Sequence, residues 1–394
     1  MEKIIKAAVE RGASDLHIKA GDVFRARING KLVALTKQAL TPDQTKAIAL
    51  RLIANEEDRL RIDKIMDYDC SWGAPGIGRF RVNILRQRSS FMIVMRVIPF
   101  QVPTIAKLGL PVSLGAVAAS ERGLVLVAGP TGSGRSSTVA ALVNHINETQ
   151  SRHIVTLEQP IELLHRDVQS SVTQREVGVD TETFRTGVKA AIRQDADVIV
   201  VGDISDAESA DISIAAAVTG RLVIGALEAL DAPGAVQRLI QLFEPSSQDS
   251  ARARVAEALH AVIAQRLLTR ITGEGRVPVI ELLRASPRVR ELILEKAVSG
   301  ALRAEMSGGD DASGSQTFEQ HLAQLVATKD VNYDVALAAS MHPNELEKHL
   351  RLLWRRSKAV NASDVMLPTP LSVPAILADL DPAAFNARVE DDES

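Results

Sequence analysis

A glycine-rich turn, GPTGSGRSS at residues 129–137, directly follows an apolar run that begins at Gly123 and is long enough for one buried strand. After the turn, apolar side chains recur from Val139 to Ile146 at the i, i+3, i+4, i+7 spacing of an amphipathic helix. A strand, a turn and a helix in this order present backbone N–H groups and the positive end of a helix dipole to an anion. The stretch therefore predicts a phosphate-binding loop in an α/β domain.

Every residue of this turn is a candidate ligand for phosphate: Gly129, Pro130, Thr131, Gly132, Ser133, Gly134, Arg135, Ser136 and Ser137. The Ser136 hydroxyl occupies the position from which such loops bind Mg²⁺ beside a nucleotide. Arg135 stands where the motif has lysine, and its wide planar fork has a different reach from a compact ammonium. The exchange therefore threatens hydrolysis more than binding. A turn without any ligand is the alternative at this point.

Alternating strand-like and helix-like segments fill residues 113–285, which is typical of a parallel sheet. Strands are expected from about His153, Asp197 and Arg221. One helix is expected from about Ala207 to Gly220, and Asp231 is expected to cap another.

The regions before and after these residues have a different sequence pattern. Residues 1–100 contain short strand-like runs between glycine-rich turns, which predicts a separate α+β domain. A linker is expected at 101–112, where prolines flank the change of pattern, and helices are expected at 286–360, interrupted by a loop at 306–316. The segment 361–394 is proline-spaced and then acidic, so we predict a flexible tail.

Composition excludes several kinds of partner. Cys70 is the one cysteine, so neither an internal disulfide framework nor a Cys-x-x-Cys zinc site can form. The net charge of -3 and the pI near 6.3 give no reason to expect nucleic acid or an anionic membrane. No uncharged apolar run approaches the roughly 18 residues of a membrane span. We expect a cytoplasmic protein that meets a membrane only through partners.

Further segments follow the phosphate loop in the order and spacing of PilT-type secretion ATPases, the motors of type IV pilus retraction. They are TLEQPIE (156–162), AIRQDADVIVVGDISD (191–206), AAVTGRLVIGALEALDA (216–232) and AVIAQRLLTR (261–270). GASDLHIKAG (12–21) and RFRVN (79–83) resemble that family's first domain, and QTFEQHL (316–322) resembles its C-terminal helical part. The resemblance implies a PAS-like N-terminal domain, a RecA-like ATPase domain and a six-membered ring with nucleotide between subunits.

The chemical motifs nevertheless depart from the family's pattern. Glu158 remains from an acidic pair, but Gln159 replaces the aspartate. Asp203 stands where the resemblance implies a catalytic glutamate that orients and deprotonates water, and misplacing a carboxylate by about 1 Å can cost roughly 10²-fold. Arg221 and Glu228 replace two histidines, and the Glu228 carboxylate repels phosphate. Asp203 and Glu158 are the candidate catalytic residues, both at degenerate positions.

Arginines of the first domain reach the nucleotide in this family, and Arg81 and Arg96 stand at the matching positions. Arg193 also matches a family arginine, and Arg266 is a weaker candidate for the same role. When the resemblance is set aside, an outward-facing strand position is the better explanation of Arg81.

The sequence predicts a ring-forming PilT-like protein that binds ATP or ADP with Mg²⁺ and hydrolyses ATP poorly or not at all. The resemblance implies a hexamer, or a mixed assembly with an active paralogue, that meets an inner-membrane platform protein of the pilus and does not bind nucleic acid. Two alternatives stay open. One is an active retraction ATPase whose replaced groups are compensated elsewhere, and the other is a structural or regulatory ring subunit that binds no nucleotide.

Overall fold

The structure, a computed structural model, describes residues 1–98, 102–296, 299–308 and 314–362. By their contacts these residues form two compact units. The first contains Met1–Val102 together with Glu158–Arg166 and Gln174–Asp180, and the second contains the rest. The predicted tail lies outside the described residues from position 363 on, as do residues 309–313 of the predicted loop.

A six-stranded antiparallel sheet, ordered β3-β2-β1-β6-β5-β4, forms the first unit. Its strands are β1 (Ala13–Lys19), β2 (Arg25–Ile28), β3 (Lys31–Ala34), β4 (Asp67–Ala74), β5 (Gly78–Gln87) and β6 (Ser90–Ile98). Alternate residues of β5, such as Phe80 and Val82, are buried because the helices α1 (Glu2–Glu10) and α2 (Pro42–Leu52) pack on that face. A short helix, α3 (Glu56–Leu60), follows α2. The predicted N-terminal α+β fold is confirmed.

A seven-stranded sheet, ordered β13-β12-β7-β11-β10-β8-β9, is the framework of the second unit, although the ends of β8 and β9 group by their contacts with the first. Its strands are β7 (Gly123–Ala128), β8 (His153–Glu158), β9 (Ser171–Glu176), β10 (Val198–Val201), β11 (Leu222–Leu227), β12 (Leu259–Thr269) and β13 (Arg276–Arg284). The five strands β8, β10, β11, β7 and β12 run parallel, whereas β13 is antiparallel to β12. The parallel sheet was predicted, but the β12–β13 hairpin was not.

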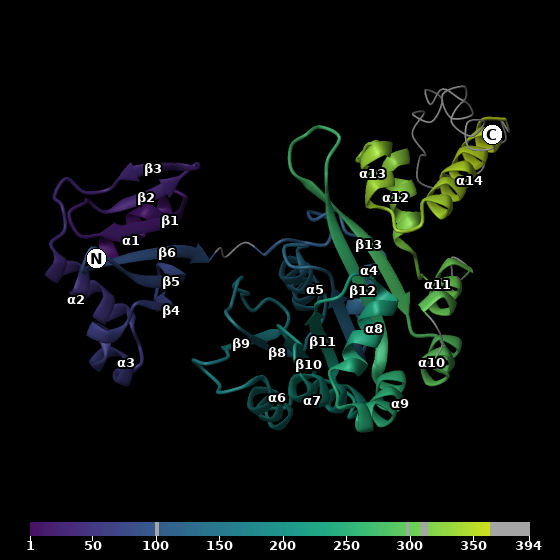
Figure 1. The fold of residues 1–394 in the computed structure, drawn as a ribbon, viewed down its shortest axis with the longest axis horizontal. Coiled ribbons are helices and arrows are strands. Elements are labelled where there is room, and N and C mark those ends of the chain that lie inside the picture. Colours follow the sequence, from purple (N-terminus) through teal and green to yellow (C-terminus); the bar gives the residue numbers. More distant parts are fainter. Residues whose placement is uncertain (99–101, 297–298, 309–313, 363–394) are drawn as a thin grey trace. The chain divides into compact units, whose positions relative to one another are not determined.

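Helices cover both faces of this sheet (Figure 1). Leu124 and Leu126 of β7 point into one core and Val125 and Val127 into the other, since successive side chains of a strand alternate between faces. One face packs against α4 (Ser113–Ala118) and α5 (Arg135–Thr149). The other packs against α6 (Phe184–Arg193), α7 (Ala207–Val218), α8 (Ala232–Gln241) and α9 (Gln248–Ala258). This is the α/β fold that the sequence predicts.

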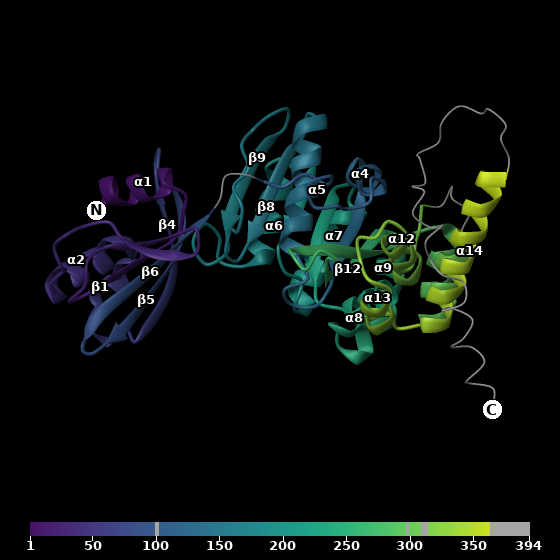
Figure 2. The ribbon, with the colours of Figure 1, turned by 90° about the horizontal axis from the view of Figure 1, so that it is seen from above.

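In the described part of the chain, five helices follow the sheet, as expected for the C-terminal part. They are α10 (Pro287–Leu294), α11 (Ser299–Gly308), α12 (Phe318–Ala327), α13 (Tyr333–Ala339) and α14 (Pro343–Ala362). Figures 1 and 2 show α12 and α14 side by side, and buried side chains of α12 such as Phe318 and Leu322 join the core under β13. Across the described ranges, no helix combines the length and apolarity that crossing a bilayer requires.

Candidate functional site

The predicted phosphate loop lies between the end of β7 at Ala128 and the start of α5 at Arg135. Gly132 and Gly134 have φ of 79° and 90°, a left-handed conformation that glycine adopts without steric cost. Gly134 is the N-cap of α5, so the first amides of a fifteen-residue helix face the loop. The backbone thus has the form of an anion cradle.

Gln265 of β12 holds this loop from the side, and it is almost fully buried. Its Nε2 donates to the carbonyl oxygen of Ser133 at 2.6 Å, and its Oε1 accepts from the Thr138 hydroxyl at 2.6 Å. One side chain therefore fixes both the loop and the first turn of α5. The sequence interpretation missed this residue, although a glutamine between apolar neighbours in a strand-like run was a signal.

Arg135 has a buried atom without a partner at this loop. Its Nη1 is shielded from solvent and has no hydrogen-bond partner among the described residues. A buried charged donor left unpaired is costly, so an anion such as a phosphate group fits this position. Ser136, the candidate for Mg²⁺, is exposed at the start of α5.

A second arginine lies at the loop. Nη1 of Arg276, at the start of β13, is 3.4 Å from the carbonyl oxygen of Gly132, and the side chain is otherwise exposed. β7 pairs with β12 only as far as Ala264, whereas β12 and β13 continue to pair as far as Thr269 and Arg276. This extension of the hairpin places Arg276 beside the phosphate loop. The hairpin was not predicted, and neither was this contact.

Asp203 and Glu228 follow neighbouring strands at the same edge of the sheet. Glu228 comes directly after β11, whose last residue Leu227 pairs with Ala128, so this exposed carboxylate lies next to the phosphate loop. Asp203 follows β10, one strand further away, and is half-buried. The amide of Gly202 donates to Leu157 and that of Ile204 to Ala226, each at 2.8 Å, so the Asp203 backbone is fixed on both sides.

Arg221 and Arg193 lie at the opposite edge. Arg221 precedes β11, and its carbonyl oxygen accepts from the amide of Gly123 at the start of β7. Arg193 ends α6, which leads back to the start of β10. Since β7, β10 and β11 are parallel, neither arginine of this unit is beside its phosphate loop.

Arg81 and Arg96 belong to the first unit, where they are cross-strand neighbours on β5 and β6. Both are exposed, and Arg96 also donates through Nε to Asp15 at 3.0 Å. Burial is the largest single influence on the pKa of Asp15 and raises it, but the hydrogen bonds from Arg96 and Ser14 together with nearby positive charge outweigh burial, so the pKa is lowered. Directly opposed arginines repel each other, and Asp15 reduces that repulsion.

Judged by their contacts, Glu158 and Gln159 belong to the first unit. Gln174 donates to the Glu158 carboxylate at 3.1 Å. Nearby, the buried Glu176 accepts from the Ser71 hydroxyl at 2.6 Å and forms an ion pair with Arg79 at 2.8 Å. Glu176 therefore ties this segment to β4 and β5, a contact between distant residues that the sequence did not indicate.

Arg266 lies one residue past Gln265 and therefore on the other face of β12. Its Nη2 donates to the carbonyl oxygen of Leu230 and its Nη1 to that of Ala339, both at 3.1 Å. The guanidinium also lies over the Phe318 ring, 4.6 Å from its centroid. Arg266 thus contacts the loop after β11 and the C-terminal helices.

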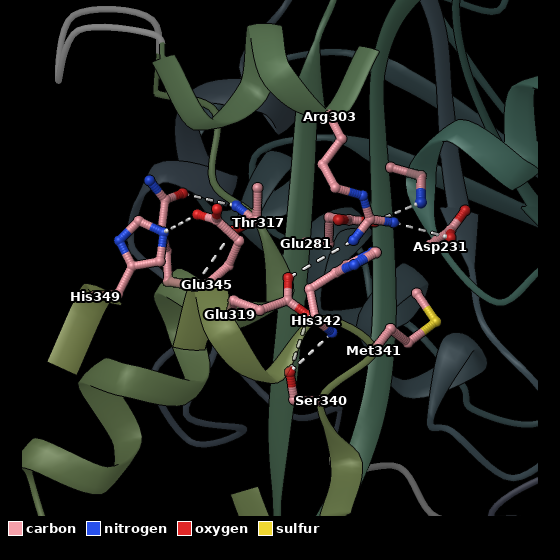
Figure 3. Close-up of polar contacts among 12 residues, drawn as sticks. Asp231, Glu281, Arg303, Thr317, Glu319, Ser340, Met341, His342, Glu345 and His349 are labelled. Atoms are coloured by element: carbon pink, nitrogen blue, oxygen red, sulfur yellow. Dashed lines mark hydrogen bonds and ion pairs between the residues drawn. The ribbon is translucent and has the colours of Figure 1, made fainter. Parts of the chain in front are cut away.

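A group of buried and half-buried charges, the Arg303 cluster, lies at the far end of that loop and consists of Asp231, Glu281, Arg303 and Glu319 (Figure 3). Arg303 Nη2 is 3.2 Å from Asp231 Oδ2, and Nη1 is 3.7 Å from Glu319 Oε2. Glu281 is fully buried on β13, and its Oε2 accepts from the amide of Ala232 at 2.6 Å. Three carboxyl groups thus face one guanidinium.

Burial raises the pKa of Glu281 to about 7, and Asp231 and Glu319 add to this rise, whereas the Ala232 amide and Arg303 oppose it. Between its ordinary pKa of 4.5 and this value, the folded chain holds a proton that the unfolded chain has lost. Stability contributed by this group is therefore present below pH 4.5 and is lost as the pH rises to about 7.

Glu281→Gln is expected to flatten the pH dependence of stability in this window, because glutamine keeps an acceptor for the Ala232 amide and does not ionise. The measurement is the urea midpoint at pH 5 and pH 8 for both chains. We expect the variant to gain stability relative to the wild type at pH 8. An unchanged difference between the two pH values would show that Glu281 does not titrate in this range.

Comparison with known proteins gives close matches across most of the chain. The family model described as "Type II/IV secretion system protein" matches residues 1–349. The type IV pilus ATPase PilU of Pseudomonas aeruginosa is 36% identical over 353 residues, which cover 89% of this chain and 91% of that protein. The type IV pilus retraction ATPase PilT of the same organism is 36% identical over 325 residues, 82% of this chain and 93% of PilT.

Solved structures agree with these matches. A crystal structure of the pilus retraction motor PilT with bound ADP has a TM-score of 0.76 and 37% sequence identity, and the match covers 88% of this chain and 99% of that one. The ATPase DotB of Legionella pneumophila has a TM-score of 0.75 at 24% identity, which supports the fold alone.

Proposed function

The chain belongs to the type II/IV secretion system protein family, with PilT- and PilU-like pilus ATPases as relatives, and we propose that it binds ADP and ATP but hydrolyses ATP slowly or not at all. The family resemblance and the RecA-like fold predicted from the sequence are confirmed. The roles of the individual site residues remain our proposal.

The proposal that nucleotide binds rests on the buried Nη1 of Arg135, which has no hydrogen-bond partner among the described residues. Loop amides from Thr131 to Ser137 would hold the phosphates, Arg135 would pair with one of them, and the Ser136 hydroxyl would hold Mg²⁺. A bound Mg²⁺ would neutralise phosphate charge. PilT, a relative of 37% identity, has a crystal structure with ADP, which supports the same ligand here.

Two carboxylates support the slow-hydrolysis half. Asp203 is fixed by backbone hydrogen bonds on both sides, so its short side chain cannot advance by a shift of the main chain. Its role would be to orient and deprotonate water, and a carboxylate drawn back by about one bond length does this poorly. Glu228 adds a negative charge beside the phosphate loop, which opposes the charge that develops there.

The proposed assembly rests on the family resemblance. We propose a homohexameric ring or a mixed ring with an active paralogue, attached to an inner-membrane platform protein of the pilus from the cytoplasmic side. The exposed pair Arg81 and Arg96 would reach a nucleotide at a subunit boundary. In this role the protein assists a retraction motor that supplies the force.

One observation favours the active alternative. Arg276 contacts the Gly132 carbonyl and would place a second positive charge at the phosphates, which lysine supplies in the standard loop. A fully active ATPase therefore stays the second candidate.

The test is equilibrium binding of ADP and ATP to the wild-type chain, with ATP turnover measured on the same sample. Saturable binding with turnover far below that of P. aeruginosa PilT under equal conditions supports the proposal. Turnover equal to that of PilT would establish the active alternative. A chain that binds neither nucleotide would instead be a structural ring subunit.

A further inference from the structure

The loop from Glu228 to Asp231 joins two places in the second unit. It begins beside the phosphate loop, because the last residue of β11 pairs with the last residue of β7. It ends at Asp231, whose Oδ1 accepts from the Gly234 amide and so caps α8. Any change at the first end that moves the loop must therefore reach the second.

Arg303 connects that second end to the C-terminal helices (Figure 3). It comes from α11, and its guanidinium lies between Asp231 and Glu319 of α12. The side chains are 17% exposed for Arg303, 19% for Asp231 and 2% for Glu319. Glu319 in turn accepts from the His342 amide at 3.2 Å, so the chain of contacts continues to the segment before α14.

The burial of these charges makes the connection stiff. Separating one member leaves an unpaired charge with little access to water, which is strongly unfavourable. Arg266 supplies a second, independent link between the same segments, because it bonds to the carbonyl oxygens of Leu230 and Ala339. The loop and the C-terminal helices are therefore held to move together.

We propose that Arg303 is a positioning residue that couples a nucleoside diphosphate bound at the phosphate loop to the C-terminal helix α12. This inference rests on the proposed function. Coupling is reciprocal, so a partner that displaces α12 changes the affinity for the nucleotide by the same factor that the nucleotide imposes on α12. The C-terminal helices would thus report the nucleotide state to whatever the ring contacts.

Hydrogen exchange of the full chain, measured by mass spectrometry with and without saturating ADP, tests the coupling. In the wild type, ADP is expected to slow exchange in the peptides covering 129–143 and also in those covering 318–327, the latter by about fivefold or more. In Arg303→Gln, slowing at 129–143 is expected to persist and slowing at 318–327 to fall by about half or more, because only the Arg266 link then remains. Arg303→Lys is expected to restore part of it.

The control is Arg290→Gln, which removes an arginine of the neighbouring helix α10 whose contacts are the carbonyl oxygens of Ala256, Glu257 and Leu259. It lies outside the cluster and is expected to keep the ADP effect on α12. Glu319→Gln gives a second break that leaves the pair of Arg303 with Asp231 intact, and it is expected to weaken the effect to the same degree as Arg303→Gln.

The possible outcomes distinguish a failure of the coupling from a failure of the proposed nucleotide binding. An ADP effect at 318–327 that is undiminished in Arg303→Gln, or that is missing from the wild type while 129–143 responds, overturns the coupling and leaves nucleotide binding in place. If ADP changes exchange in neither region of the wild type, the proposed function fails and the coupling fails with it. A role of Arg303 in stability alone would speed exchange of α12 equally with and without ADP.

Discussion

The double variant Arg135→Lys, Asp203→Glu is expected to hydrolyse ATP about 10² to 10⁴ times faster than the wild-type chain, which is the usual contribution of a well-placed general base. Glutamate extends the carboxylate by one methylene from a backbone position that hydrogen bonds to Leu157 and Ala226 hold in place. Lysine restores a compact charge at the phosphates. The measurement is steady-state ATP turnover of both chains with Mg²⁺.

The single variants show how the gain is divided. Groups that act on one transition state are not additive, so each single change is expected to give much less than the pair. Arg276→Lys is the matched control, since it exchanges the same residue types at the arginine of β13 that contacts the loop. A double variant that stays as slow as the wild type would mean that Asp203 and Arg135 do not limit hydrolysis.

Local sequence was enough to predict the strand, turn and helix around the phosphate loop. The apolar spacing after Ser137 was borne out, because Val139, Leu142, Val143 and Ile146 are all buried on α5. The cap at Asp231 and the end of α7 near Gly220 also follow from chemistry within a few residues, and both are present. Short-range hydrogen bonds and dihedral preferences decide such features, so the sequence contains them.

Contacts between residues far apart in the chain could not be predicted from the sequence. Gln265 meets Ser133 and Thr138 across more than 120 positions, and only the placement of β12 beside β7 brings them together. The antiparallel return of β13 was missed for a related reason, since a continuous apolar run has no period that separates a buried strand from a buried helix.

Membership in one sequence motif also did not show where two residues lie in the sheet. Glu228 and Arg221 occur in one sequence motif, but they flank β11, whose six residues span about 20 Å at 3.3 Å per residue. Glu228 is therefore beside the phosphate loop and Arg221 is at the other edge. Of these two residues, only Glu228 can repel a bound phosphate directly. The electrostatic argument for slow hydrolysis therefore depends on Glu228 and not on Arg221.

Gly134→Val is expected to weaken ADP binding by more than about 10²-fold. Gly134 has φ of 90°, which is strongly unfavourable for a β-branched residue, and a Cβ there would approach Gln265 Nε2 to 3.1 Å. Relief of this strain must turn the amides at the start of α5 away from the bound phosphate, and the binding-competent loop then becomes a minor state. Isothermal titration with ADP measures the loss.

Gly220→Val is the matched control, because Gly220 has nearly the same backbone, with φ of 100° and no neighbouring atom within 4 Å of an added Cβ. It precedes β11 at the edge opposite the phosphate loop, so its strain should reduce stability and leave ADP affinity within about twofold. Circular dichroism melts of both variants separate lost folding from lost binding. Equal ADP affinity in folded Gly134→Val and Gly220→Val would mean that the nucleotide does not use this loop, because the same backbone strain would then act alike at both edges of the sheet.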